Sequence, residues 1–222
     1  MKNMITFEKI KKNEQINTYI RKADESLKAL GYTEHSFAHV GIVAEVAGYI
    51  LTTMGYPERE IELAQIAGYM HDIGNVVNRV DHAQSGAIMA FRILDKLGVD
   101  AEEIATIISA IGNHDEGTAV AVNEVAAALI LADKTDVRYT RVRNNDLVSF
   151  DIHDRVNYSV KKATTLINEE KTSISLNLTI DTEVCVVMDY FEIFLGRMLL
   201  CKKAADKLKL RFHLVINGQK VL

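Results

Sequence analysis

Pro57 is the only proline among the 222 residues, and this scarcity constrains the fold more than any other feature. Because proline interrupts α-helices more strongly than any other residue, a chain with one proline can form long helices. Up to about residue 150, apolar residues recur at spacings of three and four, as on one face of a helix. In the segment 36–54 this face consists of Val40, Val43, Ala47 and Leu51. The sequence therefore predicts a mainly helical protein.

Residues 1–150 are predicted to form an all-helical domain. The predicted helices span residues 14–30, 36–54, 58–70, 83–97, 101–113 and 121–136. Gly31 follows the first of them, and Gly74 follows the third just after His71 and Asp72. Asp100 stands where an N-cap residue is expected, directly before the helix that begins at residue 101.

The hydrophobic period changes in residues 151–222. Between 174 and 180 apolar and polar residues alternate, which is typical of a strand, and the same alternation recurs over 210–216. Val156, Tyr158 and Val160 begin a similar pattern upstream, and residues 168–171 are placed to form a turn after it. With a long helix over 183–207, these residues predict a small unit of antiparallel strands and one helix.

Composition excludes several classes of protein. Lys and Arg total 26 against 30 Asp and Glu, and the formal net charge is −4. This balance argues against binding to a nucleic-acid polymer, which usually needs a basic surface. The 48% hydrophobic content argues against a disordered chain. No signal peptide and no apolar run of about 20 residues is seen, so we expect a cytoplasmic protein without a membrane span.

Four residues that bind metals well are spread over the predicted helices. His71 and Asp72 are adjacent, His39 lies 32 residues before this pair, and Asp133 lies 61 residues after it. Asp133 stands in the apolar run LILADKTD, where burying a carboxylate without a partner is costly. A metal cation is one of the few partners strong enough to compensate that cost.

This arrangement resembles the HD-domain superfamily of metal-dependent phosphohydrolases. The resemblance rests on His39 in HVGIVAEVA, on His71 and Asp72 in GYMHDIGN, and on Asp133 in LILADKTD. His82 in DHAQSGA and His114 in IGNHDEG are similar to further histidines found in members with two or more metals. The resemblance implies a helical bundle of the HD type as the main fold.

The resemblance also implies a ligand set. His39, His71, Asp72 and Asp133 would bind a first metal, and Asp72 would bridge to a second metal held by His82 and His114. Two such ions, ~3.5–4 Å apart, can hold a shared water as hydroxide for attack on phosphorus. Nitrogen and oxygen ligands suit one or two ions of Mn, Fe, Co or Ni, with Mg as an alternative. His35, four residues before His39, is expected at the rim of this site.

Further residues are candidates for catalysis and substrate binding. Lys134, Arg79 and Arg138 are expected to contact a substrate phosphate, and Lys134 is also counted among the catalytic candidates together with Asp72. Asp115 and Glu116 directly follow His114, where either could act as a general base or accept the ring N–H of a ligand histidine. His153 and His213 are interpreted as ordinary structural histidines.

The predicted function is hydrolysis of a small phosphorylated molecule, with a nucleotide as one candidate substrate. Cyclic-di-GMP hydrolysis is disfavoured, because His114-Asp115-Glu116 is followed by Gly-Thr-Ala-Val rather than the GYP stretch of that group. Asn75 stands where many relatives carry a lysine. Two alternatives stay open: a metal-containing module that senses a ligand without turnover, and a di-iron oxygenase of the same fold. A homodimer is an additional expectation.

Overall fold

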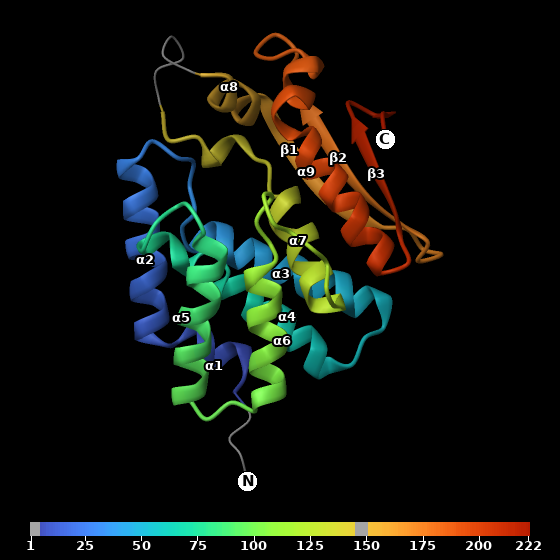
Figure 1. Cartoon of the computed structure of the whole chain (residues 1–222). Helices are drawn as coiled ribbons and strands as arrows, with labels where there is room; N and C mark the ends of the chain where they lie inside the picture. Colours follow the sequence, from blue (N-terminus) through green and yellow to red (C-terminus); the bar gives the residue numbers. More distant parts are fainter. Residues whose placement is uncertain (1–4, 145–150) are drawn as a thin grey trace.

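The computed structural model describes residues 5–144 and 151–222. The first of these ranges is helical (Figure 1), with α1 Phe7–Lys11, α2 Glu14–Ala29, α3 Phe37–Met54, α4 Glu58–Met70, α5 His82–Lys96, α6 Ala101–Gly112 and α7 Glu124–Thr135. Two short 3-10 helices, Ile73–Val76 and Tyr139–Arg141, follow α4 and α7. The six helices predicted from the sequence are confirmed, with ends that differ by three residues or fewer.

Capping residues place these helix ends as the sequence predicts. The hydroxyl of Ser36 accepts a hydrogen bond from the backbone N–H of Ala38, and the Asp100 carboxylate accepts one from Glu102. At the other end of α3, Gly55 adopts a φ of 82°, a conformation that L-residues rarely adopt. The helix lengths are therefore set by local chemistry.

The central helix α3 packs against α4 and α7. Gly68 of α4 makes the approach to α3 very close, since a Cβ added at Gly68 would lie 2.9 Å from the Cα of Ala44. The short connection at Gly55–Pro57 makes α3 and α4 antiparallel neighbours. His39, which precedes Ala44, and His71, which follows Gly68, are thereby brought to the same end of the helix pair.

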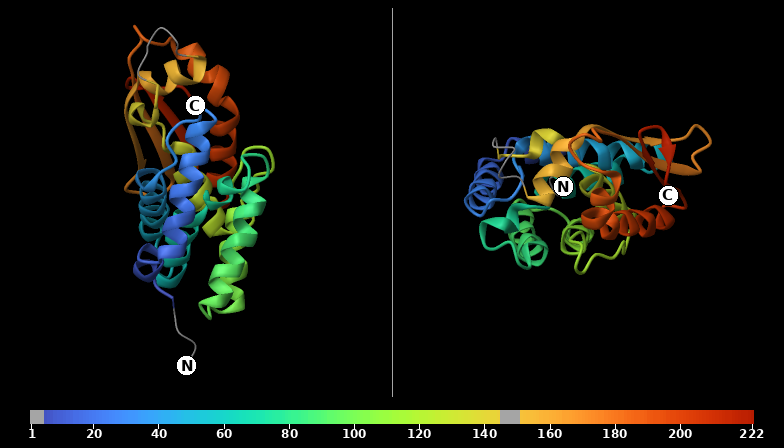
Figure 2. Two further views of the ribbon diagram at one scale, coloured as in Figure 1. Left: turned by 90° about the vertical axis from the view of Figure 1, so that its left-hand side faces the viewer. Right: turned by 90° about the horizontal axis from the view of Figure 1, so that it is seen from above.

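Residues 151–222 add α8 Ile152–Ser159, α9 Val187–Lys207 and a four-stranded sheet. The strands are β1 Val160–Ile167, β2 Ser173–Ile180, β3 Arg211–Ile216 and β4 Gln219–Lys220, and they are hydrogen-bonded in this order. The sheet and α9 lie at the end of the molecule away from the N-terminus, and α9 also packs on α7 (Figures 1 and 2). The predicted domain boundary at residue 150 lies outside the described residues.

Two expectations about this unit are wrong. The strands are not all antiparallel, because β2 and β3 pair in parallel. Parallel neighbours need a long crossover connection, and α9 supplies it between these two strands. With its sheet, the chain as a whole is mainly α but not all-α.

The second error concerns Val156 and Tyr158, which lie in helix α8 and not in a strand. The Asp151 side chain caps this helix by accepting a hydrogen bond of 2.8 Å from the backbone N–H of Asp154. An N-cap of this kind stabilises the first turn of a helix, and it favours α8 over the strand suggested by the alternation. The strand begins only at Val160, and the turn predicted at 168–171 is confirmed by a 3.0 Å bond from Lys171 N–H to the Asn168 carbonyl.

In the described part of the chain, α3 is also long and apolar enough to cross a membrane, with a mean hydropathy of 1.4. Core helices of globular proteins meet the same criterion. Val40, Val43, Ala47 and Leu51 of α3 are buried within the core of this protein.

Candidate metal centre

The predicted metal ligands meet at helix ends. His39 lies in the first turn of α3, His71 and Asp72 directly follow α4, and Asp133 lies in the last turn of α7. His82 begins α5, and His114 comes just after α6 ends. Residues far apart in the sequence therefore face one another across a single end of the bundle.

The first group of facing atoms, here named the inner set, comprises His39, His71, Asp72 and Asp133. Asp133 Oδ1 lies 3.4 Å from His39 Nε2 and 3.8 Å from His71 Nε2. Asp72 Oδ2 lies 3.7 Å and 3.3 Å from the same two nitrogens. Both histidines and Asp72 are buried. The inner set is thus a compact cage of two nitrogens and two oxygens.

A second group, here named the outer set, comprises Asp72, His82 and His114. His82 Nε2 lies 3.2 Å from His114 Nε2 and 3.6 Å from Asp72 Oδ1. Asp72 therefore offers one carboxylate oxygen to each set. This shared carboxylate is the arrangement in which a single residue bridges two ions.

Each of the four ligand histidines has an oxygen acceptor within hydrogen-bond distance of its Nδ1. Nδ1 of His71, His82 and His114 lies 2.8, 3.0 and 2.6 Å from the backbone carbonyl three residues earlier. Nδ1 of His39 lies 2.7 Å from Oδ2 of Asp136. Because these oxygens only accept hydrogen bonds, each Nδ1 carries the proton and each Nε2 presents a lone pair.

The inner set fits a divalent cation. His39 Nε2, His71 Nε2 and Asp72 Oδ2 are buried and have no hydrogen-bond partner in the described part of the chain. Unpaired buried polar atoms are costly, so three of them facing one another imply a shared partner. Separations of 3.3–3.8 Å suit a central ion with bonds of ~2.0–2.2 Å to nitrogen and oxygen. The inner and outer sets together could hold one or two ions.

The pKa shifts of Asp72, Asp133, His82 and His114 agree with this interpretation, whereas that of His71 is raised, because Asp72 and Asp133 more than offset the effect of its burial. Burial alone would raise the pKa of Asp72 and Asp133, but the neighbouring histidines and Lys134 outweigh it and hold both values well below the usual range. Burial lowers the pKa of His82, and that of His114 more strongly. Charged carboxylates and neutral imidazoles are the forms that bind metals.

Asp136 supports this centre, although sequence reasoning did not single it out. Its carboxylate accepts from His39 and also pairs with Arg138, whose Nε lies 2.7 Å from Asp136 Oδ1. Although burial opposes ionisation, these partners and Arg141 hold the pKa of Asp136 below its usual value. The available signal was its position three residues after Asp133, one turn further along the same segment.

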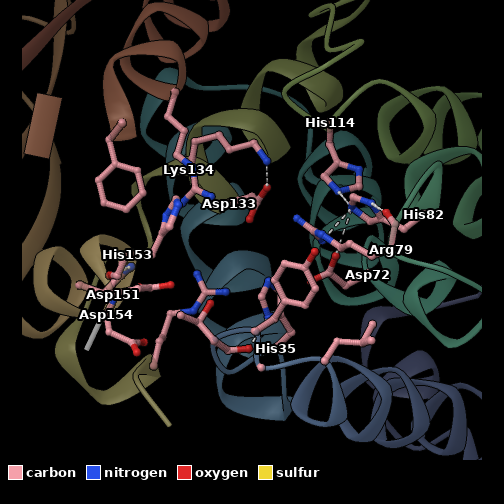
Figure 3. Close-up of a pocket in the computed structure, with 18 residues that line it drawn as sticks. His35, Asp72, Arg79, His82, His114, Asp133, Lys134, Asp151, His153 and Asp154 are labelled. Atoms are coloured by element: carbon pink, nitrogen blue, oxygen red, sulfur yellow. Dashed lines mark hydrogen bonds and ion pairs between the residues drawn. The ribbon is translucent and has the colours of Figure 1, made fainter. Parts of the chain in front are cut away.

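A cavity of about 330 Å³ opens beside the metal centre. Asp72, His82, His114 and Arg79 lie on one side of it, and Asp151, His153 and Asp154 of the α8 segment lie on the other (Figure 3). Its cationic lining residues are Arg79, Lys134, Arg141 and Arg197. An anionic molecule in this cavity would contact both the ligand cluster and several positive charges.

The structure brings some of the predicted substrate-binding residues to the cavity. Arg79 and Lys134 line it, and Lys134 Nζ lies 2.6 Å from Asp133 Oδ2. Arg138 does not line it, because its guanidinium is engaged behind His39 by Asp136 and Glu34. Of the other basic residues nearby, Arg143 pairs with Asp24. Asn145 lies outside the described residues.

The two candidate general bases differ in position. Asp115 Oδ1 lies 3.9 Å from His82 Nε2, close to the outer set. Glu116 accepts a hydrogen bond from Arg197 Nε and lies 4.0 Å from Lys134 Nζ. Asp115 is therefore nearer to the ligand cluster, and Glu116 is engaged by two cations.

Sequence reasoning missed part of the cavity wall. Phe194 and Arg197 of α9 line it, as does His153, which is exposed and is not a buried structural histidine. His35 also lines it, with Nδ1 2.7 Å from the Thr33 carbonyl and its ring edge-on to His39 at 5.4 Å. No spacing signal links α9 to the histidines, because tertiary packing alone brings them together.

Comparisons with known proteins identify the family of this chain. An uncharacterized protein of Methanocaldococcus jannaschii is 26% identical over 159 residues, which are 62% of this chain. The match spans 61% of that protein's length. The crystal structure of a predicted HD superfamily hydrolase from an uncultured Thermotogales bacterium is 27% identical, with a TM-score of 0.44, and the match covers 56% of this chain and 67% of that one. The HD domain model matches residues 34–157, more than half of the sequence, and the chain therefore belongs to the HD domain family.

Proposed function

We propose that the protein is a metal-dependent phosphohydrolase that acts on a small phosphorylated molecule. The observation that carries this proposal is the pair of facing ligand sets beside a cavity lined by Arg79, Lys134, Arg141 and Arg197. Nitrogen and oxygen ligands suit a divalent transition ion, and positive side chains suit a phosphate. Membership of the HD domain family supports the same reaction class.

The ligand sets would hold one or two ions, and the protein's own side chains would hold the substrate. When bound, such ions lower the pKa of a coordinated water and neutralise charge on phosphoryl oxygens. Lys134 and Arg79 border the ligand sets and are placed to bind the phosphoryl group of the substrate. Asp115 is the better placed acceptor for a proton from the attacking water, since Glu116 is engaged by Arg197.

The cavity also restricts the size and polarity of the substrate. Its volume of about 330 Å³ lies at the small end of the ~300–1,000 Å³ typical of ligand sites. The wall opposite the ligand cluster carries Asp151, His153 and Asp154, and Asn157 also lines the cavity. These groups offer hydrogen bonds to hydroxyl or amino groups, and Phe194 adds an apolar ring. A phosphorylated sugar or nucleoside satisfies both ends of the cavity.

Elemental analysis of the purified protein, followed by a panel of phosphoesters and nucleotides, tests the proposal. We expect bound transition metal and release of phosphate with Mn, Fe, Co or Ni added, and with Mg in parallel. A protein that holds metal but hydrolyses none of these compounds would overturn the proposal and favour a sensing module. A mixed-valent iron pair with oxygen-dependent turnover would favour an oxygenase.

A further inference from the structure

Arg79 contacts both ring nitrogens of the outer ligand His82. Its backbone carbonyl lies 3.0 Å from His82 Nδ1, and its guanidinium Nη1 lies 3.4 Å from His82 Nε2 (Figure 3). The carbonyl contact fixes the proton on Nδ1, so Nε2 has a lone pair. The guanidinium carries only N–H donors and no acceptor, so it is the donor facing that lone pair.

Through Asn75, the same arginine also reaches a second of the three outer ligands, Asp72. Arg79 Nη1 lies 3.3 Å from Asn75 Oδ1, and Asn75 Nδ2 donates a 2.8 Å hydrogen bond to Asp72 Oδ1. In the inner set, by contrast, both histidine Nε2 atoms and Asp72 Oδ2 have no such partner among residues 5–144 and 151–222. Arg79 and Asn75 thus satisfy outer-set atoms, whereas the corresponding inner atoms have no side-chain partner in the described part of the chain.

A lone pair accepts one partner at a time. The nitrogen that receives the N–H of Arg79 is the nitrogen that would bind an outer ion, and the guanidinium adds a positive charge beside that position. An outer ion must therefore displace Arg79, whereas an inner ion displaces no side chain. The protein's own cation competes with the second metal.

The guanidinium of Arg79 can also interact with a ligand in the cavity. Arg79 lines the cavity, and its guanidinium carbon lies 5.6 Å from the centre of the Tyr32 ring, on the face that supports cations. Arginine binds phosphate in a bidentate fashion, which is stronger than a 3.4 Å contact with a neutral imidazole. A phosphate in the cavity would thus draw the guanidinium away from His82.

We propose that Arg79 makes the outer ion and the substrate phosphate bind cooperatively. Without an anion, Arg79 covers His82 and weakens the outer site; with an anion, it turns to the phosphate and frees the outer ligands. This inference rests on the proposed function, because it takes the cavity as the phosphate site. Since linkage is reciprocal, the outer ion also tightens phosphate binding by the same factor.

Calorimetry and electron paramagnetic resonance of Mn²⁺ binding to metal-free protein test this coupling. For the unmodified protein, we expect one tight ion and a second ion bound at least about tenfold more weakly, with inorganic phosphate tightening the second by about tenfold, as is usual for such coupling. Arg79→Gln keeps the backbone carbonyl that orients His82 and removes the guanidinium. In this variant we expect the second ion to bind about tenfold more tightly without phosphate, and phosphate to add little.

Arg197→Gln is the matched control, because Arg197 lines the same cavity but pairs with Glu116. It should leave the ratio of the two Mn²⁺ affinities unchanged. An equal gain in both variants would overturn the inference, because it would reduce the effect to general charge. A phosphate effect that persists undiminished in Arg79→Gln would also overturn it, since phosphate would then act on the ions directly.

The two proposals fail in different ways. If the unmodified protein binds no ion, the proposed function is wrong. If it binds two ions with equal affinity, with or without phosphate, only the role of Arg79 is wrong. The comparison of the unmodified protein with and without phosphate needs no variant, so a folding defect in Arg79→Gln would not rescue the inference.

Discussion

The inner and outer ligand sets share Asp72 but differ in how their buried polar atoms find partners. The inner set is enclosed by α3, α4 and α7, and the buried Nε2 atoms of His39 and His71 have no partner in the described part of the chain. The outer set lies at the cavity, where Arg79 and Asn75 engage two of its atoms. The inner set therefore depends on its ion, whereas Arg79 and Asn75 satisfy two atoms of the equally buried outer set without one.

The two sets also differ in how much an ion bound to each would stabilise the folded protein. Each buried donor or acceptor left without a partner costs ~1–3 kcal/mol. The three unpartnered atoms of the inner set therefore make the metal-free state costly, and the protein gains stability when an ion binds there. For the outer set the gain is smaller, because binding an ion also breaks the contacts of Arg79.

Removing Asp72, which both sets share, or His71 of the inner set should have the largest effect on activity and on metal content. We expect His71→Ala or Asp72→Ala to reduce hydrolysis to background and to remove bound metal, because His71 completes the inner set and Asp72 serves both sets. Elemental analysis and phosphate release measure these two effects. His213→Ala, on β3 and away from the cavity, is the control that should change neither. Full metal content together with full rate in either ligand variant would refute the assignment.

Chelation should have the next largest effect, and it should fall on stability. An ion present at 100 times its dissociation constant stabilises the folded state by ~2.7 kcal/mol. For a chain of this length, each kcal/mol shifts Tm by ~2–4 °C. Removing the metal should thus lower Tm by about 5–10 °C, as measured by calorimetry with and without EDTA. An unchanged Tm would mean that the buried inner atoms do not depend on an ion.

His114→Ala should separate the two sets. His114 Nε2 faces His82 in the outer set, so its loss should weaken the outer ion by more than the ~10–100-fold typical of changes to supporting residues. The inner ion should stay partly bound, because His39, His71, Asp72 and Asp133 are retained. A Mn²⁺ titration that counts the bound ions distinguishes loss of the outer ion from loss of the inner ion. Equal loss of both ions would show that the sets are not separate sites.

Much of the inner set was predictable, because its residues mark helix ends that the sequence itself defines. Gly74 follows His71 and Asp72, and Ser36 caps the helix that carries His39. Local signals of this kind do not depend on the rest of the fold. The resemblance then identified which of the histidines belong together.

The parts of the site and of the fold that the sequence did not predict depend on tertiary contacts. Nothing in the spacing of Phe194 or Arg197 places α9 at the cavity, since its packing on α7 does so. The alternation at Val156 and Tyr158 suggested a strand, but the Asp151 cap outweighed it. The parallel pairing of β2 with β3 follows from the crossover through α9, whose direction the strand pattern does not contain.

The smallest effect that we predict concerns Asp136, which orients an inner ligand without binding metal itself. Asp136→Asn keeps an oxygen that can accept from His39 Nδ1 but removes the charge that strengthens this bond. Changes to such supporting groups cost ~10–100-fold in metal affinity, and we expect about the lower value because the oxygen remains. Mn²⁺ titration should show the loss for the inner ion, with the outer ion nearly unaffected.

Arg138→Gln provides the control for this variant, because it removes a partner of Asp136 but keeps the carboxylate that accepts from His39. It should weaken the inner ion less than Asp136→Asn does, since the carboxylate still accepts from His39 and still faces Arg141. If both variants weakened the inner ion equally, the effect would arise from the surrounding charges. If Asp136→Asn instead weakened binding of the outer ion more than binding of the inner ion, the proposed dependence of the inner set on the orientation of His39 would be wrong.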